Sequence, residues 1–464
     1  MLEGLEISEV SYKQVINEND WHRFDPEYYK KQATSIINII KRGKHSTIGE
    51  CFDVSKLAGF EFTEYFTPEN MQSTDCYIAL TSKNIQNERL DLTDYISINK
   101  YIADLKLSRS RIFDNDVILS YTGEYRRALT LQENRIFQLG PNICRLRPKG
   151  QNINPFYLST FLNSKIGQII LDKEKTLSAQ PTVAMSRIRL IPVPILSTDL
   201  QREIERTIKT AHKNLSQSKS LYSEAENILL SELGLKDWQP NNALVNIKQL
   251  KESFLASGRL DAEYYQTKYE DYAEYIRKYK HGFDILGNVC SLNEKNFNPV
   301  DNTEYRYIEL SNIGNSGEIT GYTTSIGAEL PSRARRLVHT NDVIVSSIEG
   351  SLQSVALVTD EYDKAICSTG FYVVKSETIN PETLLVLFKS EPMQNLLKQG
   401  CSGTILTAIG RNELHNIVMP KIRNEVQKEI AEYVQKSISL RKEAKQLLEN
   451  AKMMVEKEIE KGGE

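Results

Sequence analysis

"RFDPEYYK" (residues 23–30) and "RLDAEYYQ" (residues 259–266) are nearly the same octapeptide, found twice at an interval of 236 (259 − 23). A second pair follows in the same order. "NDVILS" (115–120) is matched by "NDVIVS" (341–346) at an interval of 226 (341 − 115). An ordered series of matches is the mark of an internal repeat, and a repeat decides the fold. The sequence therefore predicts that the chain is a duplicate of itself.

Four further matches occur between the two halves of the chain. Three of them lie at the interval of 226: "INP" at 153 and 379, "QREI" at 201 with "QKEI" at 427, and Pro194 with Pro420. Upstream the spacing changes, since Tyr77-Ile78 matches Tyr307-Ile308 at 230. A constant interval late in the repeat and a changing one early indicate loop insertions into a shared fold.

Each copy combines short β-rich runs with turn residues, and helical stretches follow them. We therefore expect an α/β (α+β) fold in two copies, separated by a pair of long antiparallel coiled-coil-like helices, with an internal pseudo-two-fold duplication. The expected domains are 1–196 (first copy), 197–235 (first spacer helix), 236–422 (second copy) and 423–464 (second spacer helix). A helix of about 36 residues spans roughly 54 Å.

The two helices carry a narrow apolar stripe at alternating four- and three-residue steps, the spacing of a coiled-coil seam. Arg441 is the exception in the stripe, and we expect neighbouring Leu440 to take its place. The alternative is that each helix lies on the surface of its own domain. The seam consists of Ile204, Ile208, Ala211, Leu215, Ser218, Tyr222, Ala225, Leu229, Ile430, Val434, Ser437, Ala444, Leu448, Ala451 and Val455.

The composition excludes several classes of protein. Lys and Arg number 58 against 61 Asp and Glu, a formal net charge of −3, so any basic surface must be local. The six cysteines form no CxxC pair, and no HExxH occurs, so no metal site is expected. The acidic start lacks the features of a signal peptide, and no apolar run reaches membrane-spanning length. We expect a cytoplasmic protein without a membrane partner.

The chain resembles the specificity subunits of prokaryotic type I restriction–modification systems. The features that carry this resemblance are the octapeptides, the "NDVI" strands, the helix starts in which a proline precedes "QREI" or "QKEI", and the paired helices. The resemblance covers essentially the full length. Their plan is target-recognition domain, conserved helix, second target-recognition domain, second conserved helix. It implies a non-catalytic subunit that reads a bipartite, asymmetric DNA target.

The resemblance also implies partners. The helices would dock two methyltransferase subunits that use S-adenosylmethionine to methylate adenine, and restriction subunits that use ATP and Mg²⁺ would join them. No cofactor is expected on this chain. One alternative is the recognition subunit of another restriction or phage-defence methyltransferase, and a second is a helical scaffold protein without a DNA role.

Reading residues are expected where the two copies differ on a common scaffold. After each "NDVI" the sequence predicts a hairpin with a different tip. Arginine suits guanine O6 and N7, whereas glutamine suits adenine N6 and N7. The hairpin candidates are Tyr121, Arg126, Arg127, Ser347, Glu349 and Gln353. The alternative is a pair of solvated surface turns.

Other candidates precede the hairpins. Basic clusters suit phosphate contacts, which need no particular sequence. Those clusters contain Arg109 and Arg111 in the first copy and Arg333, Arg335 and Arg336 in the second. A third matched pair, "LTSKNI" and "LSNIG", supplies Lys83, Asn84 and Asn312.

Two stretches could suggest catalysis. "NPFY" (154–157) is similar to the NPPY tetrapeptide of amino-methyltransferases, but it lacks the second proline and a glycine-rich cofactor turn. Its counterpart "NPET" (380–383) fits a helix start with proline in the first turn. No GxxxxGK[ST] loop occurs. The octapeptides, with paired Arg and Asp and two tyrosines, are interpreted as structural, and no catalytic residue is expected.

Overall fold

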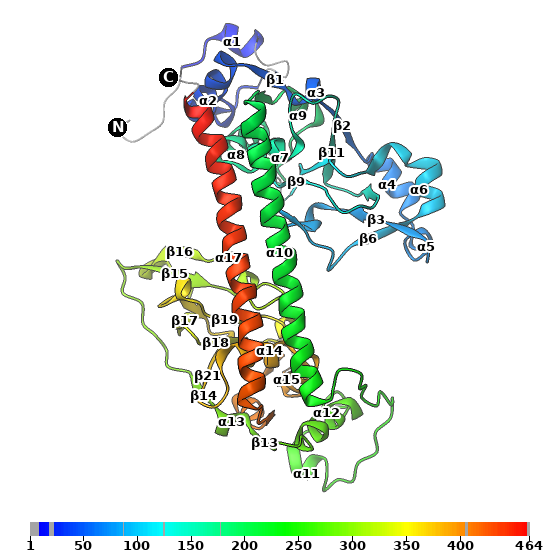
Figure 1. Cartoon of the computed structure of the whole chain (residues 1–464), viewed down its shortest axis with the longest axis vertical. Helices are drawn as coiled ribbons and strands as arrows, with labels where there is room; N and C mark the ends of the chain where they lie inside the picture. Colours follow the sequence, from blue (N-terminus) through cyan, green and yellow to red (C-terminus); the bar gives the residue numbers. More distant parts are fainter. Residues whose placement is uncertain are drawn as a thin grey trace. The chain divides into compact units, whose positions relative to one another are not determined.

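The computed structural model describes residues 9–17, 23–86, 88–123, 126–176, 178–403 and 407–461 (Figure 1). The chain divides into two compact units. The first unit contains Met1–Asn214 and Glu443–Glu464, and the second contains Leu215–Lys442. Each unit therefore holds one globular copy and part of each long helix.

The first unit contains two four-stranded sheets. One has the order β6 (Ile96–Asn99), β3 (Cys76–Leu80), β10 (Phe137–Leu139), β7 (Arg111–Ile112). The other has the order β2 (Phe52–Lys56), β11 (Ile143–Pro148), β8 (Val117–Ser120), β9 (Ala128–Thr130). Shorter pairs are β1 (His45–Thr47) with β12 (Pro192–Pro194) and β4 (Ile85–Gln86) with β5 (Arg89–Leu90).

Helices accompany these sheets. They are α1 (Tyr12–Asn17), η1 (Pro26–Tyr29), α2 (Lys31–Arg42), α3 (Ile48–Cys51), α4 (Gly59–Tyr65), α5 (Pro68–Met71), η2 (Ser82–Asn84), α6 (Lys100–Lys106), η3 (Ser108–Ser110), α7 (Pro155–Asn163), α8 (Lys165–Glu174) and α9 (Met185–Leu190).

The second unit repeats this sheet topology. Its sheets have the orders β16 (Thr323–Ile326), β15 (Glu304–Ile308), β20 (Ile366–Ser368), β17 (Ala334–Leu337), and β14 (Cys290–Asn293), β21 (Phe371–Ser376), β18 (Val343–Ser346), β19 (Val355–Leu357). In each unit one central pair is parallel, β3 with β10 and β15 with β20, whereas the other pairs of these sheets are antiparallel. Shorter pairs are β13 (Phe283–Ile285) with β24 (Val418–Pro420) and β22 (Cys401–Ser402) with β23 (Ala408–Ile409).

The helices of the second globular copy are α11 (Phe254–Ser257), α12 (Thr267–Arg277), α13 (Leu286–Val289), η4 (Leu310–Asn312), η5 (Gly327–Glu329), η6 (Glu349–Ser351), η7 (Asp360–Tyr362), α14 (Pro381–Lys389), α15 (Glu391–Gln399) and α16 (Arg411–His415). The predicted fold, with two sheet-rich α/β copies and long helices, is confirmed.

The duplication extends to single hydrogen bonds. Gln201 accepts from the Asn154 amide through Oε1 at 2.7 Å, and Gln427, at the repeat interval of 226 (427 − 201), accepts from the Asn380 amide at 2.8 Å. Both glutamines also donate through Nε2 to two backbone carbonyls of their own copy. Because a buried amide is normally paired through both its oxygen and its nitrogen, each glutamine fixes the start of its long helix to the globular copy.

The octapeptides form the same structure twice. Arg23 makes a two-pronged ion pair with Asp25 at 2.7 and 2.8 Å, and Arg259 does so with Asp261 at 2.7 and 2.9 Å. Tyr29 donates its hydroxyl to the Arg23 carbonyl, as the corresponding tyrosine does in the second copy, both at 2.9 Å. The arginines also donate to carbonyls after α8 and after α15. The structural interpretation of the octapeptides is confirmed.

One sequence match is out of register. The 3₁₀ turns after β3 and β15 are closed by equivalent capping boxes, in which Asn84 accepts from the Thr81 amide and Asn312 from the Glu309 amide, both at 2.8 Å. This pairing gives an interval of 228 (312 − 84) rather than 230. The alignment of Tyr77 with Tyr307 is therefore shifted by two positions, because two Tyr-Ile dipeptides occur by chance along equivalent strands.

The early change of interval has a structural source. Between β2 and β3 the first copy has helices α4 and α5, whereas the stretch between β14 and β15 contains no described helix. The "NPFY" stretch begins α7, with Asn154 as the N-cap and proline in the first turn, and Phe156 and Tyr157 are buried. Asn380 caps α14 in the same way. Both stretches start helices, as expected.

The long helices are α10 (Thr198–Leu233) and α17 (Asn424–Lys461), drawn in green and red in Figure 1. In the second unit their segments run antiparallel, since Ser218 contacts Ser437 and Glu232 contacts Arg423. The serine hydroxyls lie 2.9 Å apart and each donates to the other residue's carbonyl. Such small residues allow close approach of the two backbones.

Candidate nucleic-acid interface

The predicted hairpins are present. β8 pairs antiparallel with β9, and β18 with β19, and every residue of β8 and β18 is buried. α7 packs against β8 and β9, and α14 packs against β18 and β19. The turns between these strands are therefore presented by a firmly packed scaffold in each copy.

The arginines of the first turn are held by their own copy. Arg126 has a positive φ of 78° and pairs with Asp172 at 2.6 Å. Arg127 donates to the Ile85 carbonyl at 3.2 Å. Residues 124 and 125, at the tip of this turn, lie outside the described residues. Both candidate arginines thus have internal partners that DNA would have to replace or share.

Tyr121 lies at the start of the same turn. It is half-buried, and burial raises the pKa of its hydroxyl. The Lys56 ammonium lies 5.5 Å from the centre of its ring. The Tyr121 hydroxyl is therefore neutral and can both donate and accept a hydrogen bond.

The second turn has a different set of side chains. Ser347 donates its hydroxyl to the Gly370 carbonyl at 2.9 Å, and the Glu349 amide donates to the Thr407 carbonyl at 3.0 Å. Gln353 is exposed, while its carbonyl accepts from the buried Lys389 ammonium at 2.8 Å. Burial lowers the pKa of Lys389 to about 8. A buried lysine therefore holds the backbone that presents Gln353.

The basic residues of the first cluster are engaged within their copy. Arg109 pairs with Glu61 at 2.6 Å, although its side chain is 63% exposed. Arg111 pairs with Asp104, lies over the Tyr77 ring and is 23% exposed. Arg111 consequently supports strand β7, and of these two arginines Arg109 keeps the more exposed guanidinium.

The second cluster divides in a similar way. Arg336 donates to the Glu294 carbonyl and to Asn296 Oδ1, the latter at 2.9 Å. Arg333 is exposed, and its guanidinium has no hydrogen-bond partner among the described residues. Arg335 is half-buried. Arg333 is thus the residue of this cluster best placed to meet a phosphate.

The third pair is corrected in part. Asn84 is 1% exposed, and its amide nitrogen donates to the Asp91 and Asp94 carbonyls at 2.8 Å. Asn312 is half-buried and caps the equivalent turn. Asn84 cannot reach a groove because its amide closes a loop inside the copy. Lys83, by contrast, has a side chain that is 79% exposed.

The seam candidates lie in the helix pair. All are buried except Leu215, which is half-buried while its neighbour Asn214 is buried. Arg441 itself occupies the seam, where it donates to Ser218 Oγ at 2.9 Å and to Ser437 Oγ at 2.8 Å. The expectation that Leu440 would replace it is wrong, because two seam hydroxyls and Glu318 at 2.9 Å satisfy the guanidinium.

Sequence reasoning missed the segments that precede α9 and α16. Thr182 forms a β-bridge with Thr122, and Ala408 forms one with Ile348. Both pairs keep the repeat interval of 226 (408 − 182 and 348 − 122), so the spacing could have indicated them. Each segment pairs with the turn after "NDVI", and the candidate interface therefore includes it.

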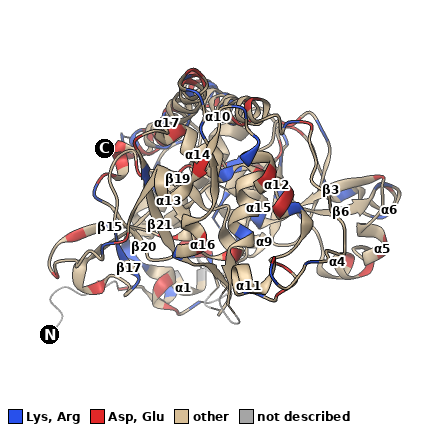
Figure 2. Cartoon of the chain, turned by 90° about the horizontal axis from the view of Figure 1, so that it is seen from below, with Lys and Arg blue, Asp and Glu red and all other residues tan. Residues whose placement is uncertain are grey.

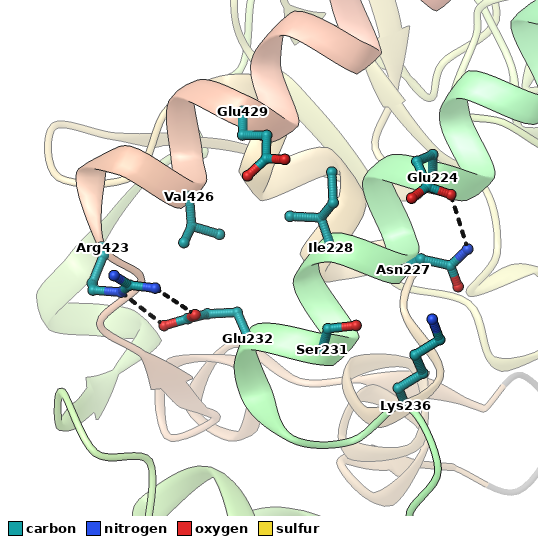
Figure 3. A pocket seen from close by; sticks show the side chains of 9 residues that line it. All are labelled: Glu224, Asn227, Ile228, Ser231, Glu232, Lys236, Arg423, Val426 and Glu429. Atoms are coloured by element: carbon teal, nitrogen blue, oxygen red, sulfur yellow. Dashed lines mark hydrogen bonds and ion pairs between the residues drawn. The ribbon is translucent and has the colours of Figure 1, made fainter.

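A groove lies between the α10 and α17 segments of the second unit (Figure 3). Its volume is about 340 Å³, and Ile228 and Val426 line it together with several charged side chains. Glu232 receives both prongs of Arg423 at 3.0 and 2.7 Å, and these hydrogen bonds lower the pKa of Glu232 to about 2. The groove is a shallow surface feature with a fixed ion pair at one end.

The charges are mixed. In the view of Figure 2, Lys and Arg segments lie among Asp and Glu segments. No group of three or more His, Cys, Asp or Glu suited to a metal occurs in the part of the chain that the structure describes. Of the helices described, none combines the length and the apolar character that crossing a membrane requires.

Comparison with known proteins adds a sequence relation. No protein-family model matches the chain. The type I restriction enzyme EcoBI specificity subunit from Escherichia coli is 26% identical over 184 residues, which are 39% of this chain and 35% of that relative. The match thus spans about a third of the relative's length.

Two solved structures are similar over most of the chain. The S subunit of a type I restriction–modification system from M. genitalium has a TM-score of 0.41 at 13% identity, covering 89% of this chain and 94% of that one. The HsdS subunit from Thermoanaerobacter tengcongensis has a TM-score of 0.29 at 14% identity, covering 89% and 95%. Because these TM-scores are low, the relation rests on the sequence match. By that match, part of this duplicated chain is similar in sequence to the specificity subunit of a type I restriction enzyme.

Proposed function

We propose that the chain is the DNA-recognition subunit of a type I restriction–modification system and that each globular copy reads one half of a bipartite, asymmetric target. One observation carries this proposal. The two copies repeat the same scaffold down to single hydrogen bonds, yet the turns after "NDVI" carry different side chains. A repeated scaffold with unlike tips suits two readers of two different sequences.

The chain would supply recognition, and its partners the chemistry. Two methyltransferase subunits would bring S-adenosylmethionine, and restriction subunits would bring ATP and Mg²⁺. The "NPFY" side chains support this division, since Phe156 and Tyr157 are 1% and 0% exposed and cannot contact a flipped base. We place the assembly on DNA in the cytoplasm.

The domain plan belongs to the same proposal. Residues 1–196 and 236–422 would be the two reading domains, and residues 197–235 and 423–464 the helices that set their spacing and dock the methyltransferase subunits. A bipartite target requires a fixed separation of its two readers, because equivalent groove positions recur with the helical turn of DNA. Paired helices of this length suit that task.

Base and phosphate contacts would come from different side chains. Gln353 offers an exposed amide suited to adenine, and Tyr121 a hydroxyl at the base of the first turn. Arg333 and Lys83 are exposed cations suited to phosphates. Arg126 and Arg127 would read guanine only after exchanging their internal partners.

The test is methylation-sensitive sequencing of DNA from cells that carry this chain together with its partner methyltransferase. We expect a split, asymmetric motif with modified adenines on both strands, lost when the chain is deleted. A contiguous motif, or methylation that persists without the chain, would refute the proposal. Co-purification with the tagged chain identifies the partner subunits and so separates a type I system from another restriction or phage-defence methyltransferase. A DNA-protection assay tests the scaffold alternative, since a scaffold protein would protect no bipartite DNA even with a methyltransferase present.

A further inference from the structure

The segment before α9, which includes residues 178–183, is hydrogen-bonded at several points to the turn between β8 and β9, called here the first reading turn. The Val183 amide donates to the Tyr121 carbonyl at 2.9 Å, and the Thr122 and Thr182 hydroxyls lie 3.2 Å apart. On its other side, the Thr176 amide donates to the Thr182 carbonyl at 2.8 Å. The segment is thus a small loop closed on itself and fastened to the turn.

The second copy repeats this arrangement. The Ile409 amide donates to the Ser347 carbonyl at 2.8 Å, as Val183 does to Tyr121, and both partners keep the interval of 226 (409 − 183 and 347 − 121). A loop that is fastened to the reading turn in both copies is part of the common scaffold. In the first copy, the exposed residues 178–180 therefore lie on a loop whose backbone is held beside the turn.

Gln180 is the exposed amide of this loop in the first copy. Its backbone carbonyl accepts from the Ser178 hydroxyl at 2.6 Å, which fixes the backbone. Its side-chain amide has no hydrogen-bond partner among the described residues. The amide nitrogen lies beside Gly123, 3.6 Å from the position where a Cβ atom of that residue would be.

Gly123 is in van der Waals range of this amide and has a backbone conformation that suits glycine. Its φ is 72°, a left-handed conformation that favours glycine, so the turn backbone beside the Gln180 amide is fixed in a shape that few other residues adopt. At the same interval the second copy has Glu349 (349 − 123 = 226). A glutamate thus stands in the second copy where the first has a glycine. The two copies therefore differ in chemistry at this point of an otherwise shared scaffold.

We propose that Gln180 is a specificity-determining residue of the first copy and reads an adenine in its half of the target. This inference rests on the proposed function. A glutamine amide can accept from adenine N6 and donate to N7 at the same time, which no other base allows in that orientation. Because the backbone of this loop is already held by hydrogen bonds, binding would have to order only the Gln180 side chain.

The experiment uses the full chain assembled with its partner methyltransferase and a DNA library in which each base pair of both half-sites is varied. Gln180→Ala should reduce discrimination at one adenine position of one half-site by roughly 10- to 100-fold. The other half-site should keep its preference. Gln180→Glu should have the same effect, because a carboxylate cannot donate to N7.

Gln151→Ala is the matched control. Gln151 is an exposed glutamine of the same copy, but it follows the far end of β11, whereas the reading turn lies at the strand's start. It should leave every position unchanged. Full retention of discrimination in Gln180→Ala, or an equal loss across both half-sites, would overturn the inference. If the wild-type chain itself shows no split motif, the proposed function fails instead.

Discussion

The arginines of the basic cluster in the second copy, in the stretch "PSRARR" (residues 331–336), have very different surroundings. Arg336 is committed to Asn296 and to a backbone carbonyl, whereas Arg333 is exposed. A guanidinium that already has partners gives up hydrogen bonds when it turns to a phosphate, but an exposed one gives up only water. Charge in the sequence is therefore a poor guide to which arginine is open to an outside partner.

The salt dependence of DNA binding should distinguish Arg333 from Arg336. Arg333→Ala should lower the slope of log K against log salt by about 0.9, the contribution of one phosphate contact, without changing the preferred sequence. Arg336→Ala is the control and should leave the slope unchanged, because that guanidinium supports the copy itself. The measurement is DNA binding by the assembled complex at salt concentrations from about 50 to about 200 mM. Equal slopes for Arg333→Ala and the wild type would contradict the assignment.

Glu232 shows how a residue at the end of α10 contributes to stability. Besides Arg423, its carboxylate accepts from the Tyr279 hydroxyl at 2.6 Å. Its pKa of about 2 lies below the ordinary glutamate value of 4.5. A depressed carboxyl pKa stabilises the folded state above the unfolded value, and this contribution is lost as pH falls from about 4.5 to about 2.

Glu232→Gln should therefore destabilise the chain at pH 7 by about 1 kcal/mol, a value reduced because Arg423 is partly open to solvent. The difference between wild type and variant should shrink steadily as pH falls below about 4.5. Urea unfolding at a series of pH values measures it. Glu224→Gln, on the same helix but facing Asn227, is the control. A gap that stays constant down to the lowest pH measured would contradict the role of the ion pair.

At this scale the sequence predicts chemistry but not exposure. Lys83 and Asn84 are neighbours in one candidate motif, yet one side chain is 79% exposed and the other residue 1%. The difference arises from the capping box that turns the asparagine inward, and hydrogen bonds to the carbonyls of Asp91 and Asp94 complete it. Such local satisfaction depends on three-dimensional loop closure, which residue type alone does not determine.

At the scale of elements, the helix pair combines close backbone approach with a polar centre. In the second unit, Ser218 and Ser437 allow the contact, and Arg441 fills the space beside them. Its guanidinium also reaches Glu318, whose loop follows β15. A loop of the second copy is therefore fastened to α17 by a partly buried ion pair.

Removing one partner of this pair should be costly. Arg441→Ala should destabilise the second unit by about 2–4 kcal/mol, because Glu318 and two hydroxyls lose this partner. Arg441→Met with Glu318→Gln should recover much of that loss, since both charges are removed together. Thermal unfolding of Arg441→Met, Glu318→Gln and the double variant, compared with the wild type in a double-mutant cycle, gives the coupling. Additive effects of the two substitutions would show that the pair is not coupled.

Elements were predicted best where many residues share one pattern. The seam spacing and the absence of Pro and Gly suffice to indicate long helices, because a helix depends on a sustained period. The exception, Arg441, could not be predicted, since its partners include another helix and a loop. The strand alignment at Tyr77 failed for a related reason. A dipeptide recurs easily, whereas the register of a sheet is set by its turns and pairing.

At the scale of the whole molecule, duplication gives one chain two globular copies, and under the proposed function each copy reads its own half of the target. The shared scaffold includes the Gln201 and Gln427 anchors and the two octapeptides, which make matching contacts in both copies. Substitutions at the turns should therefore change one half of a target without disturbing the other. This independence is the central claim.

A chimera tests it most directly. A chain whose residues 236–422 are replaced by a second copy of residues 1–196 is expressed with the partner methyltransferase, and the methylated motif is sequenced. We predict a symmetric target, in which the half-site read by the first copy occurs twice in inverted orientation. Methylation at the original asymmetric target, with the chimera folded and bound to its partner, would contradict it.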